Sequence, residues 1–244
     1  MQPLGTRVHY YLAAGSPDLP SCHPAGAPAE LHSFEITPPL ALAVSGLPSN
    51  LFTVEPPYGV QWVASNFTVR ATTSYSLQGT NGWRTACIGW QGGGSVPPTG
   101  TADFCNFTMT GPSIITWLWQ PQTALMHTSS PTGALASNTW HETGSIASSL
   151  WTPESHTSSN NPLTFAGWTL DGMRWPTNNA PSRLQIHGIP MAAPHLATAT
   201  YLPTTQDSDA NHLPDWFEFR YFGQLGQNRY DDPDSDSFEN ELEA

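Results

Sequence analysis

Short stretches in which apolar and polar residues alternate run through the chain from about residue 39 to residue 119. Residues 67–72 show the pattern best, since Phe67, Val69 and Ala71 fall on one face of an extended segment. Further strands are predicted at residues 40–44, 83–90, 104–109 and 114–119. Segments rich in Gly and Pro, such as residues 91–100, separate these strands as turns. The pattern predicts a compact unit of short strands.

A second stretch repeats the order of these signals. Phe165-Ala-Gly-Trp168 corresponds to Cys87-Ile-Gly-Trp90, and Met191 corresponds to Met109. The remaining correspondences are Pro57-Tyr-Gly59 with Pro131-Thr-Gly133, Asn66–Val69 with Gly144–Ala147, and Trp117–Trp119 with Ala199–Tyr201. In each Gly-Trp pair, glycine permits close backbone approach and tryptophan fills a small core. The chain is therefore expected to be mostly β, with two tandem repeat units.

Four segments follow from these signals. Residues 1–38 are poorly patterned and are expected to form a poorly structured arm, in which residues 30–36 are the one strand candidate. Residues 39–122 form the first β-repeat and residues 123–203 the second. Residues 204–244 form an acidic tail with little helix.

The charge balance excludes two classes of function. The 244 residues include seven Arg and no Lys against 19 acidic residues, giving a net charge of −12. Nucleic acids and anionic membrane surfaces both attract basic proteins, so neither is an expected partner. No apolar run is long enough to span a membrane. The first residues lack the pattern of a signal peptide, which a fragment of a longer chain would explain.

The acidic tail contains two twelve-residue segments with the ligand spacing of an EF-hand calcium loop. Such a loop supplies side-chain oxygens at positions 1, 3, 5, 9 and 12 and a backbone carbonyl at position 7. The first segment supplies Asp207, Asp209, Asn211, Leu213, Asp215 and Glu218. The second supplies Asp232, Asp234, Asp236, Phe238, Asn240 and Glu243. Both are predicted to bind Ca²⁺, and a solvated acidic tail is the alternative.

Both loops depart from the EF-hand pattern at position 6, where the backbone turns sharply and glycine is usual. That position is His212 in the first loop and Ser237 in the second. Histidine tolerates a left-handed conformation better than serine does, but both are less suited to it than glycine. Weaker or more constrained calcium binding than in a loop with glycine is therefore expected.

The residues of the second stretch and of the tail also carry a family resemblance. Gly133…Trp140…Gly144-Ser-Ile-Ala…Phe165-Ala-Gly-Trp168…Met191…Ala199-Thr-Tyr201 resembles the divergent internalin-type B-repeat of bacterial surface and secreted proteins. The tail resembles the thrombospondin type 3-like calcium segments at the C-termini of such proteins. The resemblance implies small β-grasp-like or β-sandwich repeats, an extracellular or cell-surface location, and a spacing or adhesion role towards surface glycans or proteins.

The three cysteines are too few for a disulfide framework. Cys87 and Cys105 lie in neighbouring predicted strands, and either pair in an oxidising compartment or are two small buried apolar residues. Cys22 would be left over.

No motif indicates catalysis, and the chain is expected not to be an enzyme. The nine histidines form no His-Glu-x-x-His pattern, and no Gly-x-Ser-x-Gly elbow is present. Asp171 is expected to form a turn or to pair with Arg174. Gly92-Gly-Gly94 lacks the Lys-Ser/Thr of a phosphate-binding loop and is expected to be a hairpin loop.

The tryptophans suggest a second class of function. Five of them lie outside the predicted core strands or at their rims: Trp62, Trp83, Trp140, Trp151 and Trp175. Exposed indole rings stack on sugars, so a carbohydrate-binding module is the alternative to a structural or adhesion module, with core filling as the simpler role of tryptophan. An accessory region of a larger secreted hydrolase is a third possibility.

Overall fold

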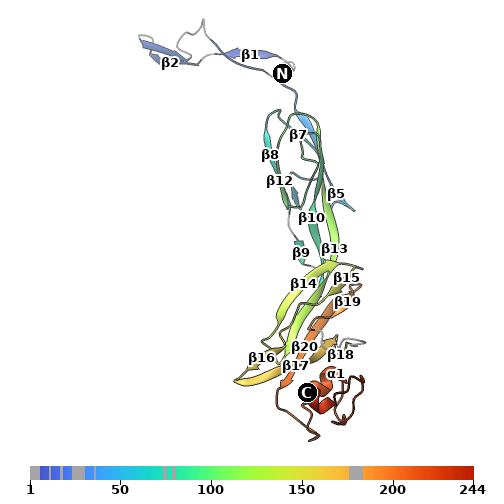
Figure 1. The fold of residues 1–244 in the computed structure, drawn as a ribbon. Coiled ribbons are helices and arrows are strands. Elements are labelled where there is room, and N and C mark those ends of the chain that lie inside the picture. Colours follow the sequence, from blue (N-terminus) through green and yellow to red (C-terminus); the bar gives the residue numbers. More distant parts are fainter. Residues whose placement is uncertain are drawn as a thin grey trace. The chain divides into compact units, whose positions relative to one another are not determined.

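The computed structural model describes residues 6–10, 12–16, 19–23, 31–35, 37–73, 76–78, 81–175 and 184–244 (Figure 1). Within them the backbone is mainly strand with two short helices, which confirms the expected mostly-β fold. The strands are β1 (Arg7–Tyr10), β2 (Leu12–Ser16), β3 (Leu19–His23), β4 (His32–Glu35), β5 (Leu40–Leu47), β6 (Val54–Glu55), β7 (Gly59–Val63), β8 (Thr68–Thr73), β9 (Ser76–Gln78), β10 (Trp83–Gly93), β11 (Thr99–Gly100), β12 (Phe104–Thr108), β13 (Ser113–Ser130), β14 (Ala136–Glu142), β15 (Ile146–Ser148), β16 (Ser155–Ser158), β17 (Asn161–Leu170), β18 (Met173–Arg174), β19 (His187–Pro190) and β20 (His195–Pro203). The helices are α1 (Asp215–Tyr221) and α2 (Asn240–Glu243).

The chain divides into two compact units that are each built from two stretches of sequence. The first unit comprises Met1–Ser76 and Ala86–Gln120, and the second comprises Leu77–Thr85 and Pro121–Ala244. The alternation of residues did not indicate that residues 77–85 belong to the second unit. There the backbone N–H of Ala124 donates to the carbonyl oxygen of Gly82 over 2.8 Å.

The first unit is a two-layer β-structure. In one layer β5 pairs with β7 antiparallel and with the first part of β13 in parallel, and β10 pairs with β11. The other layer is the three-stranded sheet β12-β8-β6 (Figure 1). The core between them is formed by inward side chains of both layers, among them Leu42, Val69, Phe107, Ile115 and Trp117. Alternating residues therefore face one core, as the period of two predicts.

The second unit repeats this pairing. The later part of β13 pairs with β14 antiparallel and with β20 in parallel, and β20 pairs with β17. Strands β15 and β19 form the facing two-stranded sheet. The core contains Leu125, Phe165, Trp168, Met191 and Tyr201.

The same hydrogen bonds join equivalent residues in the two units. In the first unit Asn66 N donates to Met109 O over 2.7 Å, and Met109 N donates to Phe67 O over 2.9 Å. In the second unit Gly144 N donates to Met191 O over 2.9 Å, and Met191 N donates to Ser145 O over 2.8 Å. Both methionine side chains are fully buried. The sequence correspondence of Met109 with Met191 is thus a correspondence in backbone structure.

Both backbone conformation and space require glycine in the first Gly-Trp pair. Gly89 has φ +129°, and a Cβ atom there would lie 2.0 Å from the carbonyl oxygen of Gly100. Gly167, its counterpart, has φ +146° but no atom within 4 Å of such a Cβ. Close backbone approach therefore explains the glycine in the first unit, and backbone conformation alone explains it in the second.

The first 38 residues differ from the expected poorly structured arm. Among their described residues β1 pairs with β4, and β2 pairs with β3, both antiparallel. Strand β4 falls within the predicted segment 30–36, whereas the other three were not predicted. The alternation rule missed them because these strands are short and rich in small or polar residues.

Cys87 and Cys105 are free thiols that are buried in the same core. Burial raises the pKa of both thiols, so they behave as small apolar residues. This agrees with the second of the two alternatives for the pair. The side chain of Cys22 lies outside the described part of the chain.

Candidate metal centre

The first predicted calcium loop is a ring of side-chain-to-backbone hydrogen bonds that leads into helix α1. The Asp207 carboxylate accepts the N–H of Asn211 over 3.2 Å and that of His212 over 2.9 Å. The side-chain oxygen of Asn211 accepts the N–H of Leu213 over 2.7 Å. Such bonds turn successive residues around a common centre, because each carboxylate or amide folds back on the backbone that follows it.

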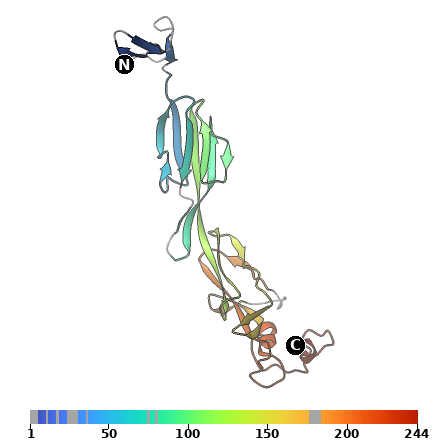
Figure 2. The same ribbon diagram turned by 90° about the vertical axis from the view of Figure 1, so that its left-hand side faces the viewer.

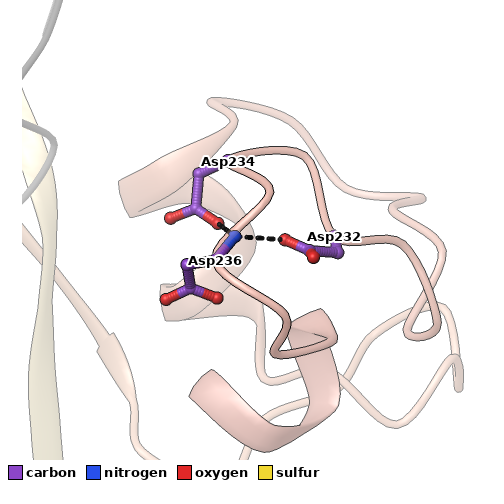
Figure 3. A group of neighbouring side chains, drawn as sticks. All are labelled: Asp232, Asp234 and Asp236. Atoms are coloured by element: carbon purple, nitrogen blue, oxygen red, sulfur yellow. Dashed lines mark hydrogen bonds between the residues drawn. The ribbon is translucent and has the colours of Figure 1, made fainter.

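The second loop repeats these bonds 25 residues further along the chain. The Asp232 carboxylate accepts the N–H of Asp236 over 3.2 Å and that of Ser237 over 2.9 Å. The Asp236 carboxylate accepts the N–H of Phe238 over 2.9 Å. Figure 3 shows Asp232, Asp234 and Asp236 around one point, and one oxygen from each lies within 4.8 Å of the others.

Both loops adopt the left-handed backbone at position 6 despite the missing glycine. His212 has φ +74° and Ser237 has φ +80°. Two residues earlier, Ala210 has φ +56° and Ser235 has φ +63°. A left-handed non-glycine residue costs on the order of 1–2 kcal/mol, so each loop holds its shape against a local penalty.

The residues at position 9 are both buried, but their side-chain oxygens differ in their hydrogen bonds. Asp215 is only 2% exposed, and Ser208 N, Ser208 Oγ and Gln206 Nε2 donate to its two oxygens over 2.6–2.7 Å. Asp215 therefore closes the first loop through hydrogen bonds. Its counterpart Asn240 is 1% exposed and donates from Nδ2 to Asn228 O over 2.8 Å, and its Oδ1 has no hydrogen-bond partner.

The glutamates at position 12 lie in unequal surroundings. Glu218 is fully buried, and its Oε1 accepts N–H groups from Asn211 and Gln227 over 3.0 and 2.8 Å. Its Oε2 is buried without a hydrogen-bond partner. Glu243 is exposed and has neighbouring carboxylates rather than donors.

Negative charge accumulates in the second loop. Burial raises the pKa of Glu243, and the charges of Asp234, Asp236 and Asp232 raise it further. Four carboxyl groups at positions 1, 3, 5 and 12 thus repel one another, and a divalent cation among them would relieve that repulsion.

The donor set fits a hard cation. The side-chain donors at the predicted positions are carboxylate or amide oxygens, which Ca²⁺ prefers. Two buried oxygens without partners, Glu218 Oε2 and Asn240 Oδ1, lie at ligand positions of the two loops. The side chain of Leu213 is buried whereas that of Phe238 is 55% exposed, and position 7 would contribute only a carbonyl in either loop.

The first loop is joined to the second unit through helix α1, which lies against β17 and β20 (Figure 2). Phe217 is 2% exposed, and Arg220 forms an ion pair with Glu154 over 3.0 Å. Arg174 Nη2 donates to the carbonyl oxygen of Phe219 over 2.6 Å, near the C-terminal end of the helix. Formation of the first loop and docking of this helix are therefore linked.

The sequence did not single out several residues that hold the loops. Gln206, Ser208, Gln227 and Asn228 all bond to predicted ligand residues. They lie beside or between the ligand positions and carry no motif. One indirect signal was available, because residues with small polar side chains or amides cluster on both sides of the first loop.

His195 forms a hydrogen-bonded contact with Asp171. His195 Nδ1 lies 2.6 Å from Asp171 Oδ2, and its Nε2 lies 3.0 Å from the carbonyl oxygen of Pro190. Burial opposes ionisation of Asp171, but the Leu196 N–H and His195 outweigh it and lower the pKa of Asp171. Through His195, Asp171 is therefore linked to the start of β20 and the end of β19. Asp171 lies in a turn with φ +54°, which agrees with the first of the two alternatives, and its carboxylate bonds to His195 rather than to Arg174.

The five tryptophans singled out from the sequence differ in exposure. Trp62 and Trp151 are each 70% exposed, and Trp83 is 41% exposed. Trp140 is partly covered by the Arg84 guanidinium, 4.3 Å from its ring centre, and Trp175 packs against the core of the second unit. Trp62 and Trp151 are the two of these five best placed to stack on a ligand.

Comparisons with known proteins give one similarity. No protein-family model matches the chain, and no curated protein matches it. The chain is similar to a solved structure of Streptococcal High Identity Repeats in Tandem (SHIRT) domains 3–4 from a cell surface protein, at 11% identity and a TM-score of 0.22. The match covers 67% of this chain and 96% of that chain. A TM-score of this size does not indicate a common fold. Among the described residues, no helix is long and apolar enough to cross a membrane.

Proposed function

We propose that this chain is a non-enzymatic structural or adhesion module of a secreted or cell-surface protein, with a C-terminal segment that Ca²⁺ stabilises. The observation that carries the proposal is the repetition in the tail. Three hydrogen bonds of the first loop and its two left-handed residues recur 25 positions later. A solvated acidic tail that binds no ligand would not be expected to form the same hydrogen-bonded loop at two places.

The two β-units support the structural part of the proposal. They repeat the same parallel and antiparallel pairing, and the chain passes from one to the other within β13. Tandem units of this kind extend a surface without any need for catalytic residues. Calcium loops of extracellular modules bind at 10⁻⁴ to 10⁻³ M, so loops lacking the position-6 glycine suit a location where calcium is abundant.

Calcium should raise the melting temperature of the protein. Ca²⁺ at about 10 mM is about 10 to 100 times a Kd of this size, and should stabilise the folded protein by about 1.4 to 2.7 kcal/mol per site, which for a chain of this size corresponds to a few degrees. Differential scanning calorimetry in millimolar Ca²⁺ and in chelator measures the shift. Asp232→Asn should remove much of it, whereas Glu55→Gln, which alters an exposed acid outside the tail, should retain it. Identical melting curves with calcium and with chelator would refute the calcium part of the proposal.

A carbohydrate-binding module is the second candidate, and the exposure of Trp62 favours it. Trp62 lies opposite Ala41 on the neighbouring strand, and Val60 lies opposite Ala43. Small neighbours leave the indole face open, and sugar rings stack on such faces.

Neutral oligosaccharides should therefore quench the tryptophan fluorescence if this second function holds. A titration with cellohexaose and chitohexaose, with calcium and with chelator, should give saturable quenching that does not depend on calcium. Trp62→Ala should abolish it, and Trp140→Ala, which alters a ring already covered by Arg84, serves as the control. No saturation with either sugar at millimolar concentration counts against sugar binding.

A further inference from the structure

The two loops differ at position 5, where the first has Asn211 and the second has Asp236. In both, one side-chain oxygen accepts the N–H of the residue two positions later, over 2.7 Å and 2.9 Å. This bond fixes the orientation of the side chain. The other terminal atom is then an N–H₂ group in Asn211 and a carboxylate oxygen in Asp236.

The Asn211 amide nitrogen lies among acceptors. Its distances are 3.3 Å to Asp209 Oδ2, 3.0 Å to Glu218 Oε1 and 3.0 Å to the carbonyl oxygen of Gln227. Asp209 and Glu218 hold positions 3 and 12 of the loop. A hydrogen-bond donor thus occupies the place from which a cation would contact these two carboxylates.

The second loop has no such donor at position 5. The Asp236 carboxylate adds a negative charge to those of Asp232 and Asp234, with one oxygen of each within 4.8 Å of the others. Asn240, at position 9 of the same loop, is 1% exposed and has a side-chain oxygen without a partner. In the first loop, Glu218 Oε2 is likewise buried without a partner. The other oxygen of that carboxylate, Oε1, already accepts hydrogen bonds from Asn211 and Gln227.

We propose that the Asn211 amide substitutes for the ion in the first loop, so that this loop closes without metal and the second loop alone takes the divalent cation. The proposal rests on the calcium function proposed above and assigns different roles to the two loops. The first loop anchors helix α1 on the second unit at any calcium concentration. The second loop orders the end of the tail only when the cation is bound.

The competing arrangement has the Asn211 amide turned over. Its oxygen would then face the ion together with Glu218, and the hydrogen bond from Leu213 N–H would be lost. That arrangement predicts two ions per chain, and the substitution of an amide for the ion predicts one. The number of bound ions therefore separates them.

Calorimetric titration of the full chain with Ca²⁺ tests the proposal, with matched variants at position 3 of each loop. The wild-type protein and Asp209→Asn should each bind one ion, and Asp234→Asn should bind none. Asn211→Asp should bind two, because a carboxylate oxygen replaces the N–H donor. The melting temperature of Asn211→Asp in chelator should fall below that of the wild type and recover in calcium, which shows that the variant still folds.

Two ions in the wild-type protein, or one ion that is lost in Asp209→Asn and kept in Asp234→Asn, would overturn the division of roles while leaving calcium binding intact. A wild-type protein that binds no Ca²⁺ at millimolar concentration would refute the calcium function itself.

Discussion

Replacing Trp168 with alanine should destabilise the second unit by about 3–5 kcal/mol, the usual cost of removing a large aromatic side chain from a core. Trp168 is 2% exposed and packs edge-on against Phe165, with 5.9 Å between the ring centres. Its indole nitrogen has no hydrogen-bond partner, so the loss comes from apolar burial and packing. Differential scanning calorimetry in chelator should show the transition of the second unit at a much lower temperature.

Trp151→Ala provides the matched control. The same side chain is removed at a position that is 70% exposed, so the free energy of unfolding should change by less than about 0.5 kcal/mol. Equal effects of the two substitutions would contradict the assignment of Trp168 to the core.

His127→Val should stabilise the protein by about 1 kcal/mol at neutral pH. His127 is 3% exposed, and neither ring nitrogen has a hydrogen-bond partner, which is costly for a buried polar group. The position is equivalent to Val44 of the first unit, since His127 pairs with Ala197 as Val44 pairs with Ile115. Valine therefore fits the same place in the same architecture.

The stabilisation should grow in acid. Burial lowers the pKa of His127. The nearby Ser137 backbone, which does not reach hydrogen-bond geometry, opposes this shift, and the charge of His141 lowers the pKa further. An unfolded histidine binds protons at higher pH than the buried one, so stability is complete above about pH 6.5 and declines as pH falls through the lowered pKa. The His127→Val substitution should therefore remove the loss of folding stability at low pH that protonation of His127 causes.

Urea denaturation at pH 7.5 and pH 5 measures the effect, with His9→Val as a control at an exposed histidine. The gap between His127→Val and wild type should widen at the lower pH, by up to about 1.4 kcal/mol per pH unit. A gap that stays constant or narrows would show that His127 is not held neutral in the folded protein. Burial also lowers the pKa of His141. The stability of the His127→Val variant should therefore keep a smaller dependence on pH.

The sequence predicts strands well where side chains alternate around one core. Val69 and Phe107 fall in β8 and β12 as their alternation indicates, because only one face of each strand is buried. It does not predict which strands pair. The parallel pairs of β13 with β5 and with β20 join segments that are far apart in the chain, and no local pattern records them.

The same limit applies to the loops. The spacing of Asp and Asn residues located the two segments that form loops, and in the structure these side chains fold back on the backbone that follows them. It does not predict which oxygen remains for a ligand. Asp215 accepts hydrogen bonds from Gln206 and Ser208, which the spacing rule does not count. Asn211 presents its nitrogen to Glu218, which the rule counts only as a ligand of the ion.

Strand β13 limits where the chain can accept inserted or deleted residues. Its 18 residues begin in the first unit and finish in the second, with hydrogen-bonded partners in both. Added or deleted residues within it would shift the strand register and turn every following side chain to the wrong face. New sequence is therefore best accommodated at hairpin tips or chain ends, and the passage between the units is the least permissive place for a fusion or a cut.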